Sequence, residues 1–197
     1  MKLAKYFAAV FLVGLLGCQS GDSEKQVAQT GGAQLPSGDV LYTIPAGWVE
    51  EAPTSSMRRA QYKWPGTEGL ADAEIAVFFF PGTGGSVQAN LSRWYGQFKQ
   101  PDGSPTAAVA KSEKRMVKDL PVTITYATGT YLKNAGMMMG DSHPAQELKN
   151  YALLAAIVET AHGPWFFKAT GPNKTIQHWR NSFDEFVNSF TLRKPNV

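Results

Sequence analysis

The chain has 197 residues, of which 43% are hydrophobic, and its 19 basic and 16 acidic residues give a formal net charge of +3. This length and apolar content suit one globular domain with an ordinary core. The charge is nearly balanced and there is no run of Lys or Arg, which excludes the basic surface that nucleic-acid binding requires. We therefore expect no nucleic-acid partner.

The first segment has the pattern of an export signal. Lys2 and Lys5 precede an uncharged apolar stretch over 6–16, which is too short to span a bilayer as a helix. The stretch ends in Leu15-Leu16-Gly17-Cys18, which resembles the lipobox of bacterial lipoproteins. In that motif, small residues admit the signal peptidase and the cysteine thiol takes a diacylglyceryl group. The alternative is an ordinary signal peptide with an incidental cysteine.

The lipobox resemblance implies a signal peptide over 1–17 and a mature chain that begins at Cys18, anchored in the membrane by acyl chains such as palmitate. Gln19 stands where an Asp would favour retention in the inner membrane, so we expect an outer-membrane anchor and a domain facing the periplasm of the cell envelope. Loss of Lys2 and Lys5 lowers the formal net charge to about +1. Cys18 is the sole cysteine, so its acylation leaves no thiol nucleophile, disulfide or cysteine-based zinc site.

The next segment, 18–37, is rich in Gly, Ser and Gln and has almost no large apolar side chains. Such a segment buries too little surface to offset the entropy lost on ordering, and we predict a flexible tether. Residues 38–197 contain no repeat and no second tether, so we predict that they form one domain.

Alternation and apolar runs predict seven strands in this domain. They are expected over 39–45, 58–64, 73–80, 114–118, 122–132, 151–160 and 164–170. The fourth and fifth form a hairpin through Asp119-Leu120-Pro121, and the sixth is apolar enough to be a central strand covered on both faces. Most connections are too short for helical crossovers, so neighbouring strands should pair antiparallel.

Two segments change to helical periodicity. In 86–98, apolar residues recur on one stripe and Ser86 is the expected N-cap. In 173–190, six apolar residues share a stripe, with Asn173 as the expected N-cap behind Pro172. Each amphipathic helix should pack its stripe on the sheet. The predicted fold class is therefore α+β, with an antiparallel sheet flanked by helices.

The order of these elements resembles that of a set of uncharacterised bacterial lipoproteins. The resemblance rests on YTIPAGW, on AEIAVFFFPGTGGSVQANLSRWYGQF and on the closing segment from Tyr151 to Phe190. Their domain is similar to the PsbP fold of photosystem II and to the DcrB envelope proteins. What the resemblance implies is a PsbP-like α/β/α sandwich with an accessory or binding role. It carries no catalytic motif, so no functional residue is transferred from it.

No local signature of an enzyme is present in the sequence. There is no G-x-S-x-G, H-E-x-x-H or S-x-x-K motif. His162 is expected in a turn and His178 near the start of the last helix, as surface or packing residues. The glycine-rich stretch over 81–87 lacks the Gly-Lys-Ser/Thr ending of a phosphate loop and fits a strand-to-helix turn. We expect a protein that is not an enzyme, with a hydrolase as the alternative.

The long connection over 133–150 is the segment least explained by folding. Met137, Met138, Met139 and His143 are thioether and imidazole groups that suit Cu(I), and Asp141 lies between them. One interpretation is a copper-binding loop. The other is a loop that contacts a partner or covers the core, because Met is also an adaptable apolar residue.

The sequence as a whole therefore favours a membrane-anchored envelope lipoprotein with a non-catalytic accessory or binding domain, and an envelope protein as its partner. The alternative is a lipoprotein that binds copper or another small ligand through the 133–150 loop and the cleft beside the last helix.

The copper interpretation predicts that replacing Met137, Met138, Met139 and His143 with Ala abolishes copper binding, since these side chains supply the soft ligands. Copper stoichiometry measured by mass spectrometry under reducing conditions checks this. An unchanged stoichiometry in the fourfold variant would contradict it, and Met57→Ala serves as the methionine control.

Overall fold

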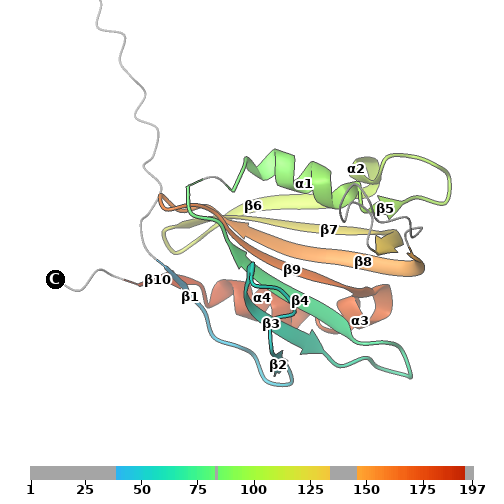
Figure 1. Cartoon of the computed structure of the whole chain (residues 1–197), viewed down its shortest axis with the longest axis horizontal. Helices are drawn as coiled ribbons and strands as arrows, with labels where there is room; N and C mark the ends of the chain where they lie inside the picture. The colour runs from blue at the N-terminus through green and yellow to red at the C-terminus, as the bar shows by residue number, and fades with distance from the viewer. Residues whose placement is uncertain (1–38, 83, 134–145, 194–197) are drawn as a thin grey trace, which may run out of the picture. The chain divides into compact units, whose positions relative to one another are not determined.

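The computed structural model describes residues 39–82, 84–133 and 146–193. These residues form an eight-stranded sheet with helices on both faces, and one pair of short strands beside it (Figure 1). The strands are β1 (Val40–Leu41), β2 (Val49–Glu51), β3 (Arg58–Trp64), β4 (Ala73–Phe79), β5 (Phe98–Lys99), β6 (Lys111–Val117), β7 (Leu120–Lys133), β8 (Gln146–Val158), β9 (Trp165–Pro172) and β10 (Thr191–Leu192). The helices are α1 (Val87–Tyr95), α2 (Thr106–Val109), α3 (Asn173–His178) and α4 (Arg180–Asn188).

The strand order of the large sheet is β2-β3-β4-β9-β8-β7-β5, and β6 also pairs with β7. Every pairing is antiparallel, as the short connections predict. The short strands β1 and β10 pair with each other.

Strand β8 lies in the middle of this sheet, between β7 and β9. All six residues over 153–158 are at most 1% exposed, because both faces of the strand are covered. The prediction of a central, doubly covered strand is confirmed. The strand begins at Gln146, five residues earlier than the apolar run indicates.

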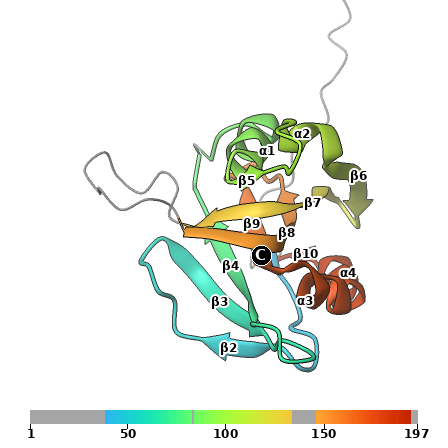
Figure 2. The ribbon, with the colours of Figure 1, turned by 90° about the vertical axis from the view of Figure 1, so that its right-hand side faces the viewer.

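Helices cover the two faces of the sheet separately (Figure 2). On one face α1 packs through Leu91, Trp94 and Tyr95 against β8 and β9. On the other face α3 and α4 pack through Ile176, Phe183 and neighbouring aromatic residues. The predicted α+β class, one domain with an antiparallel sheet between helices, is confirmed.

The start of α1 agrees with the sequence. The Ser86 hydroxyl accepts a hydrogen bond from the Ala89 amide at 3.1 Å, which satisfies one of the free N–H groups of the first turn. Ser86 is therefore the N-cap, as predicted.

The prediction for the last helix is wrong in two respects. The segment 173–190 is two helices, α3 and α4, separated at Trp179, and Asn173 is the first residue of α3 instead of its cap. Trp179 leaves helical geometry (φ −89°, ψ 3°) because its indole N–H donates to the Pro65 carbonyl at 3.0 Å. The Phe183 amide still bonds to the Trp179 carbonyl, so the apolar stripe continues across the break.

Two boundaries also differ from those predicted. Val117 pairs with Leu120, so the β6–β7 turn consists of Lys118 and Asp119, with Lys118 at φ 54°. A two-residue hairpin turn requires positive φ, and the predicted three-residue turn is wrong. The strand predicted over 39–45 is reduced to Val40–Leu41, because only these residues pair with β10.

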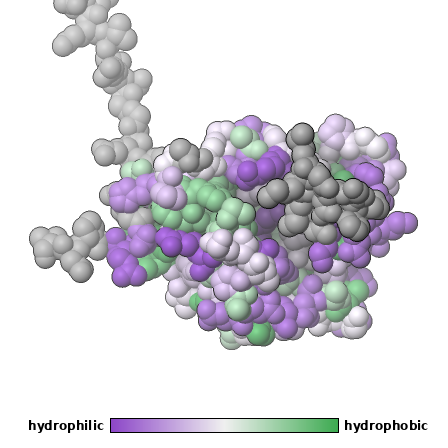
Figure 3. All heavy atoms as spheres, viewed as in Figure 1, coloured by the Kyte–Doolittle hydropathy of each residue, from purple (hydrophilic) through white to green (hydrophobic). Residues whose placement is uncertain are grey.

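The surface of the described residues carries scattered apolar groups. The large exposed ones, which come from five different segments, are Leu41, Val49, Met57, Val109 and Met116. Figure 3 shows a mostly hydrophilic face with a hydrophobic area left of its centre and smaller hydrophobic spots at the lower right and lower edge. Within the part of the chain that the structure describes, none of the helices has both the length and the apolar character to cross a bilayer.

The core on the α3–α4 side is centred on Phe167 of β9. Its ring meets those of Tyr42, Phe186 and Phe190, with centroids 5.3, 5.3 and 4.6 Å away. Phe167→Ala should lower the free energy of unfolding by about 3 to 5 kcal/mol, because it leaves a cavity among these rings. Urea unfolding measures this. Met116→Ala, at a side chain that is 62% exposed, should change stability by less than about 0.5 kcal/mol. Equal effects of the two substitutions would contradict this account.

Candidate functional site

The residues singled out for lipidation and copper binding lie outside the described residues. They are Cys18, Met137, Met138, Met139, Asp141 and His143. The lipid anchor and the copper loop therefore stay predictions.

The two histidines that the structure describes are both exposed. His162 lies in the turn between β8 and β9, and His178 is the last residue of α3, with its ring edge-on to Trp179. Over 39–82, 84–133 and 146–193, no three His, Cys, Asp or Glu side chains gather closely enough to hold a metal ion.

The glycine-rich stretch before α1 is used by the fold. The Gly82 amide donates to the His162 carbonyl at 2.9 Å, and the Asn90 side chain donates to the Gly84 and Ser86 carbonyls. These contacts make the stretch a strand-to-helix turn, as its sequence indicates.

A groove of about 390 Å³ lies beside α4, where the helix faces the β6–β7 hairpin and β8. This is the position of the cleft expected beside the last helix. Three cations, two carboxylates and three apolar residues are among the ten residues that line it. They are Lys111, Ser112, Glu113, Arg115, Ile124, Tyr126, Leu154, Arg180, Phe183 and Asp184.

Alternation along β6 places three of its four charged side chains toward this groove. Lys111, Glu113 and Arg115 are two residues apart, so they point to the same face of the sheet. Arg180 enters from the first position of α4, immediately after the bend at Trp179.

The Arg180 guanidinium lies over the ring of Tyr126, 5.1 Å from its centroid. Tyr126 is itself held in place, because its hydroxyl donates to Asn173 Oδ1 at 2.5 Å and accepts from Gln177 Nε2 at 3.4 Å. A cation above an aromatic face is attracted by the ring quadrupole. The position of Arg180 is thus set by α3 and β7 as well as by its own helix.

Arg115 lies between the two carboxylates of the groove. Its terminal nitrogens are 3.3 Å from Asp184 and 3.7 Å from Glu113. Its Nε–H is buried and has no acceptor among the described residues. Arg115 therefore balances part of the acidic charge and leaves one hydrogen-bond donor unsatisfied.

The positive charges of Lys111 and Arg180 are not neutralised in this way. Among the described residues, no carboxylate lies within 4.0 Å of either side chain, whereas Asp184 and Glu113 are both directed at Arg115. Three cations against two carboxylates give the groove one positive charge in excess. An unpaired guanidinium and an unpaired ammonium are groups that recognise anions.

Sequence reasoning located the cleft but named none of its charged residues. The one local signal was the alternation of charge along β6, which by itself is typical of a protected edge strand. The pairing of Tyr126 with Arg180 joins residues that are far apart in sequence, and no local pattern predicts it.

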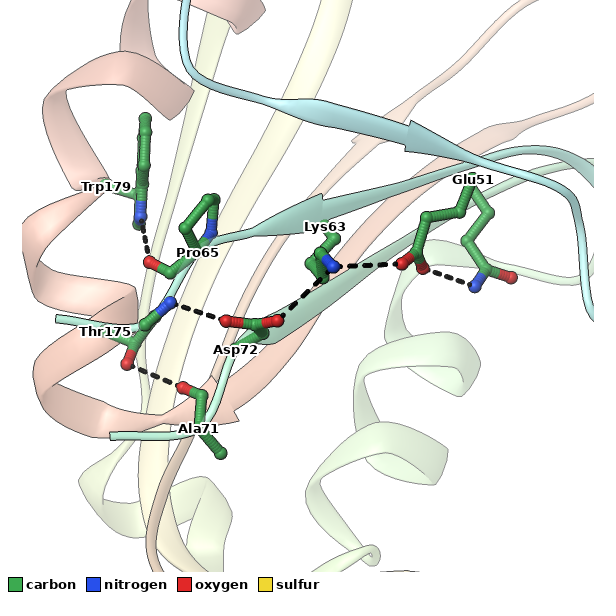
Figure 4. Close-up of polar contacts among 9 residues, drawn as sticks. Glu51, Lys63, Pro65, Ala71, Asp72, Thr175 and Trp179 are labelled. Atoms are coloured by element: carbon green, nitrogen blue, oxygen red, sulfur yellow. Dashed lines mark hydrogen bonds and ion pairs between the residues drawn. The ribbon is translucent and has the colours of Figure 1, made fainter. Parts of the chain in front are cut away.

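A second charged cluster lies on β2, β3 and the β3–β4 connection (Figure 4). Lys63 is 3.5 Å from both Glu51 and Asp72. Asp72 also accepts from the Gly66 amide at 2.7 Å, and Glu51 accepts from Gln61 Nε2 at 3.1 Å. All these carboxylates have partners, so the cluster holds the loop to the sheet.

The same connection is fastened to the helices on its other side. Trp179 donates to the Pro65 carbonyl, and Thr175 Oγ1 donates to the Ala71 carbonyl at 3.1 Å (Figure 4). The residues over 65–72 therefore join β3, β4 and the α3–α4 bend into one unit.

On the opposite face of the sheet, Lys168 of β9 lies beside α1. Its Nζ donates to Gln97 Oε1 at 2.6 Å and is 6.0 Å from the centroid of the Trp94 ring. Burial lowers the pKa of Lys168 to about 8, and the charge of Arg93 acts in the same direction. Its nearest acceptor is a neutral amide, which does not compensate the charge.

Comparison with known proteins found no matching family model and no matching curated protein. The chain is similar to solved structures at about a tenth sequence identity. A Pseudomonas aeruginosa protein of unknown function, PA94, has a TM-score of 0.47 and 9% identity over 81% of this chain and 100% of its own.

Two further structures have comparable scores. LpqN of Mycobacterium tuberculosis, which is involved in cell envelope biogenesis, has a TM-score of 0.47 and 10% identity over 84% of this chain and 88% of its own. The cyanobacterial PsbP protein of Synechocystis sp. PCC 6803 has a TM-score of 0.45 and 10% identity over 85% of this chain and 99% of its own.

The lowered pKa of Lys168 gives a specific pH dependence of stability. The unfolded chain keeps this proton up to a pKa near 10.5, whereas the folded chain loses it near pH 8. Between these values the unfolded state binds more protons, so this group makes the free energy of unfolding rise with pH. Lys168→Met should abolish that rise between pH 7.5 and 9.5 in urea unfolding.

Lys174→Met changes an exposed lysine of α3 and is the matched control, which should keep the pH profile of the wild type. The same pH profile for Lys168→Met and the wild type would show that Lys168 titrates as an ordinary lysine.

Proposed function

We propose that this chain is a lipid-anchored protein of the bacterial cell envelope whose domain binds a ligand or partner without transforming it. In this proposal residues 1–17 are a signal peptide, Cys18 carries the lipid, 18–37 form the tether and 38–197 form the binding domain. The anchor is in the outer membrane, the domain faces the periplasm, and an envelope protein is the macromolecular partner.

The groove beside α4 is the observation that carries the binding role. It presents a guanidinium and an ammonium that have no acidic partner among the described residues, next to a tyrosine whose hydroxyl is already bonded to Asn173. Unpaired charge in a concave site supports recognition of a complementary group.

The same residues support binding over catalysis. A hydrolase needs a nucleophile with a base in hydrogen-bond reach. In the groove, the two carboxylates face Arg115, and no histidine is among the ten lining residues. Neither His162 nor His178 lines this groove, and both are exposed elsewhere.

The anchor is proposed from the lipobox pattern that ends at Cys18. More than one acyl chain makes membrane attachment effectively stable, whereas one chain gives only reversible binding. The tether of about twenty residues would have a root-mean-square reach of roughly 25 Å, which lets the domain stand away from the bilayer.

Cys18→Ala should prevent acylation of the chain, because the thiol is the attachment point for the lipid. The variant should then be found either in the soluble fraction or as the precursor with its signal peptide uncleaved, and the acylated mass should be absent. Cell fractionation with mass spectrometry of the mature N-terminus measures both. Ser20→Ala is the control and should stay acylated. Wild-type protein that is soluble, or processed at a site other than Cys18, would contradict the proposed anchor.

A further inference from the structure

We propose that the groove beside α4 is a binding site for a phosphate group, held by Arg180 and Lys111, on a small phosphorylated ligand or on a lipid headgroup. This inference rests on the proposed binding role and names the chemistry of the ligand.

Charge is the first argument for phosphate. Arg180 and Lys111 together offer two positive charges that no described carboxylate within 4.0 Å neutralises. Glu113 and Asp184 repel a bound anion only weakly, because both carboxylates form an ion pair with Arg115. A phosphate group has three acceptor oxygens and can accept hydrogen bonds from Arg180 and Lys111 at once, and its first negative charge matches the one positive charge that the groove has in excess.

The orientation of Arg180 is the second argument. Its guanidinium carbon lies over the Tyr126 ring, 5.1 Å from the centroid, and this attraction holds the side chain beside the groove. Asn173 and Gln177 fix the Tyr126 hydroxyl from α3, which holds the ring under the guanidinium. An arginine that is already ordered loses less entropy when it binds an anion.

Unsatisfied hydrogen-bonding capacity is the third argument. The Nε–H of Arg115 is buried and has no acceptor among the residues that the structure describes. A buried donor without an acceptor is unfavourable, and an anion bound in the groove would reduce this cost through its charge.

The size of the groove limits the ligand. Its volume of about 390 Å³ is within the range of small-molecule sites, and Ile124, Leu154 and Phe183 close its floor. The floor residues are at most 6% exposed, so the contact surface is mainly polar. These features fit a small phosphorylated molecule or one headgroup better than an extended chain.

The test uses the full chain in nonionic detergent, with inorganic phosphate as the probe. Resonances of the arginine Nε–H groups, recorded while phosphate is added, should shift for Arg180 and Arg115. Arg180→Gln should weaken phosphate binding about tenfold or more, because it removes a charge-assisted contact. Lys111→Gln should weaken it as well.

Arg59→Gln is the matched control. Arg59 also lies over an aromatic ring, 5.6 Å from the centroid of Phe79, but it does not line this groove. Its replacement should leave phosphate affinity unchanged. Unfolding midpoints without phosphate show whether each variant is folded. Absence of shifts at the groove, or equal loss of binding in Arg180→Gln and Arg59→Gln, would overturn the proposal.

A second titration separates the two sources of phosphate. Vesicles of phosphatidylcholine with phosphatidic acid should displace inorganic phosphate from the groove if a headgroup is the ligand, and glycerol 3-phosphate should displace it if the ligand is a free small molecule. If the protein stays in the membrane fraction but binds neither phosphate probe, the phosphate site is overturned and the proposed lipid anchor is unaffected. Release of the wild type from membranes would instead contradict the proposed anchor.

Discussion

The packing of the α3–α4 pair against the sheet is the interaction on which the rest of the structure depends. Phe183, Phe186 and Phe190 are fully buried against β4, β8 and β9, with Phe167 at their centre. Because the chain has a single cysteine, no disulfide within the chain contributes to stability, and this packing supplies the stabilisation. It also fixes where α4 lies above the hairpin, and therefore creates the groove.

Much of the fold was predictable because its signals are local. The apolar run in β8 indicated a strand covered on both faces, and the Ser86 cap indicated where α1 begins. The β6–β7 turn was predicted over 119–121 and lies at 118–119, because the sequence does not show that Lys118 adopts positive φ. The break at Trp179 was missed because its cause, a bond to the Pro65 carbonyl, comes from a distant segment.

The candidate site was far less predictable, because the contacts that form it join residues that are distant in the sequence. Arg180 and Tyr126 meet only because β7 and α4 pack on the same face of the sheet. An arginine at the polar edge of an amphipathic helix has no local mark that separates it from solvent-exposed arginines. Motif reasoning, by contrast, selected Cys18 and three methionines between β7 and β8, which lie outside the described residues. The loop predicted over 133–150 is shorter in the structure, because β7 extends to Lys133 and β8 begins at Gln146.

The hydrogen bond between Trp179 and Pro65 connects the α3–α4 bend, next to the groove, with the β3–β4 connection. Trp179 immediately precedes Arg180, and the 65–72 connection holds Trp179 through its indole. If the groove binds phosphate as we propose, and if opening of this connection displaces Arg180 from the Tyr126 ring, ligand binding would raise the free energy of that opening by thermodynamic linkage. The Trp179 indole is the contact that would link the β3–β4 connection to the groove.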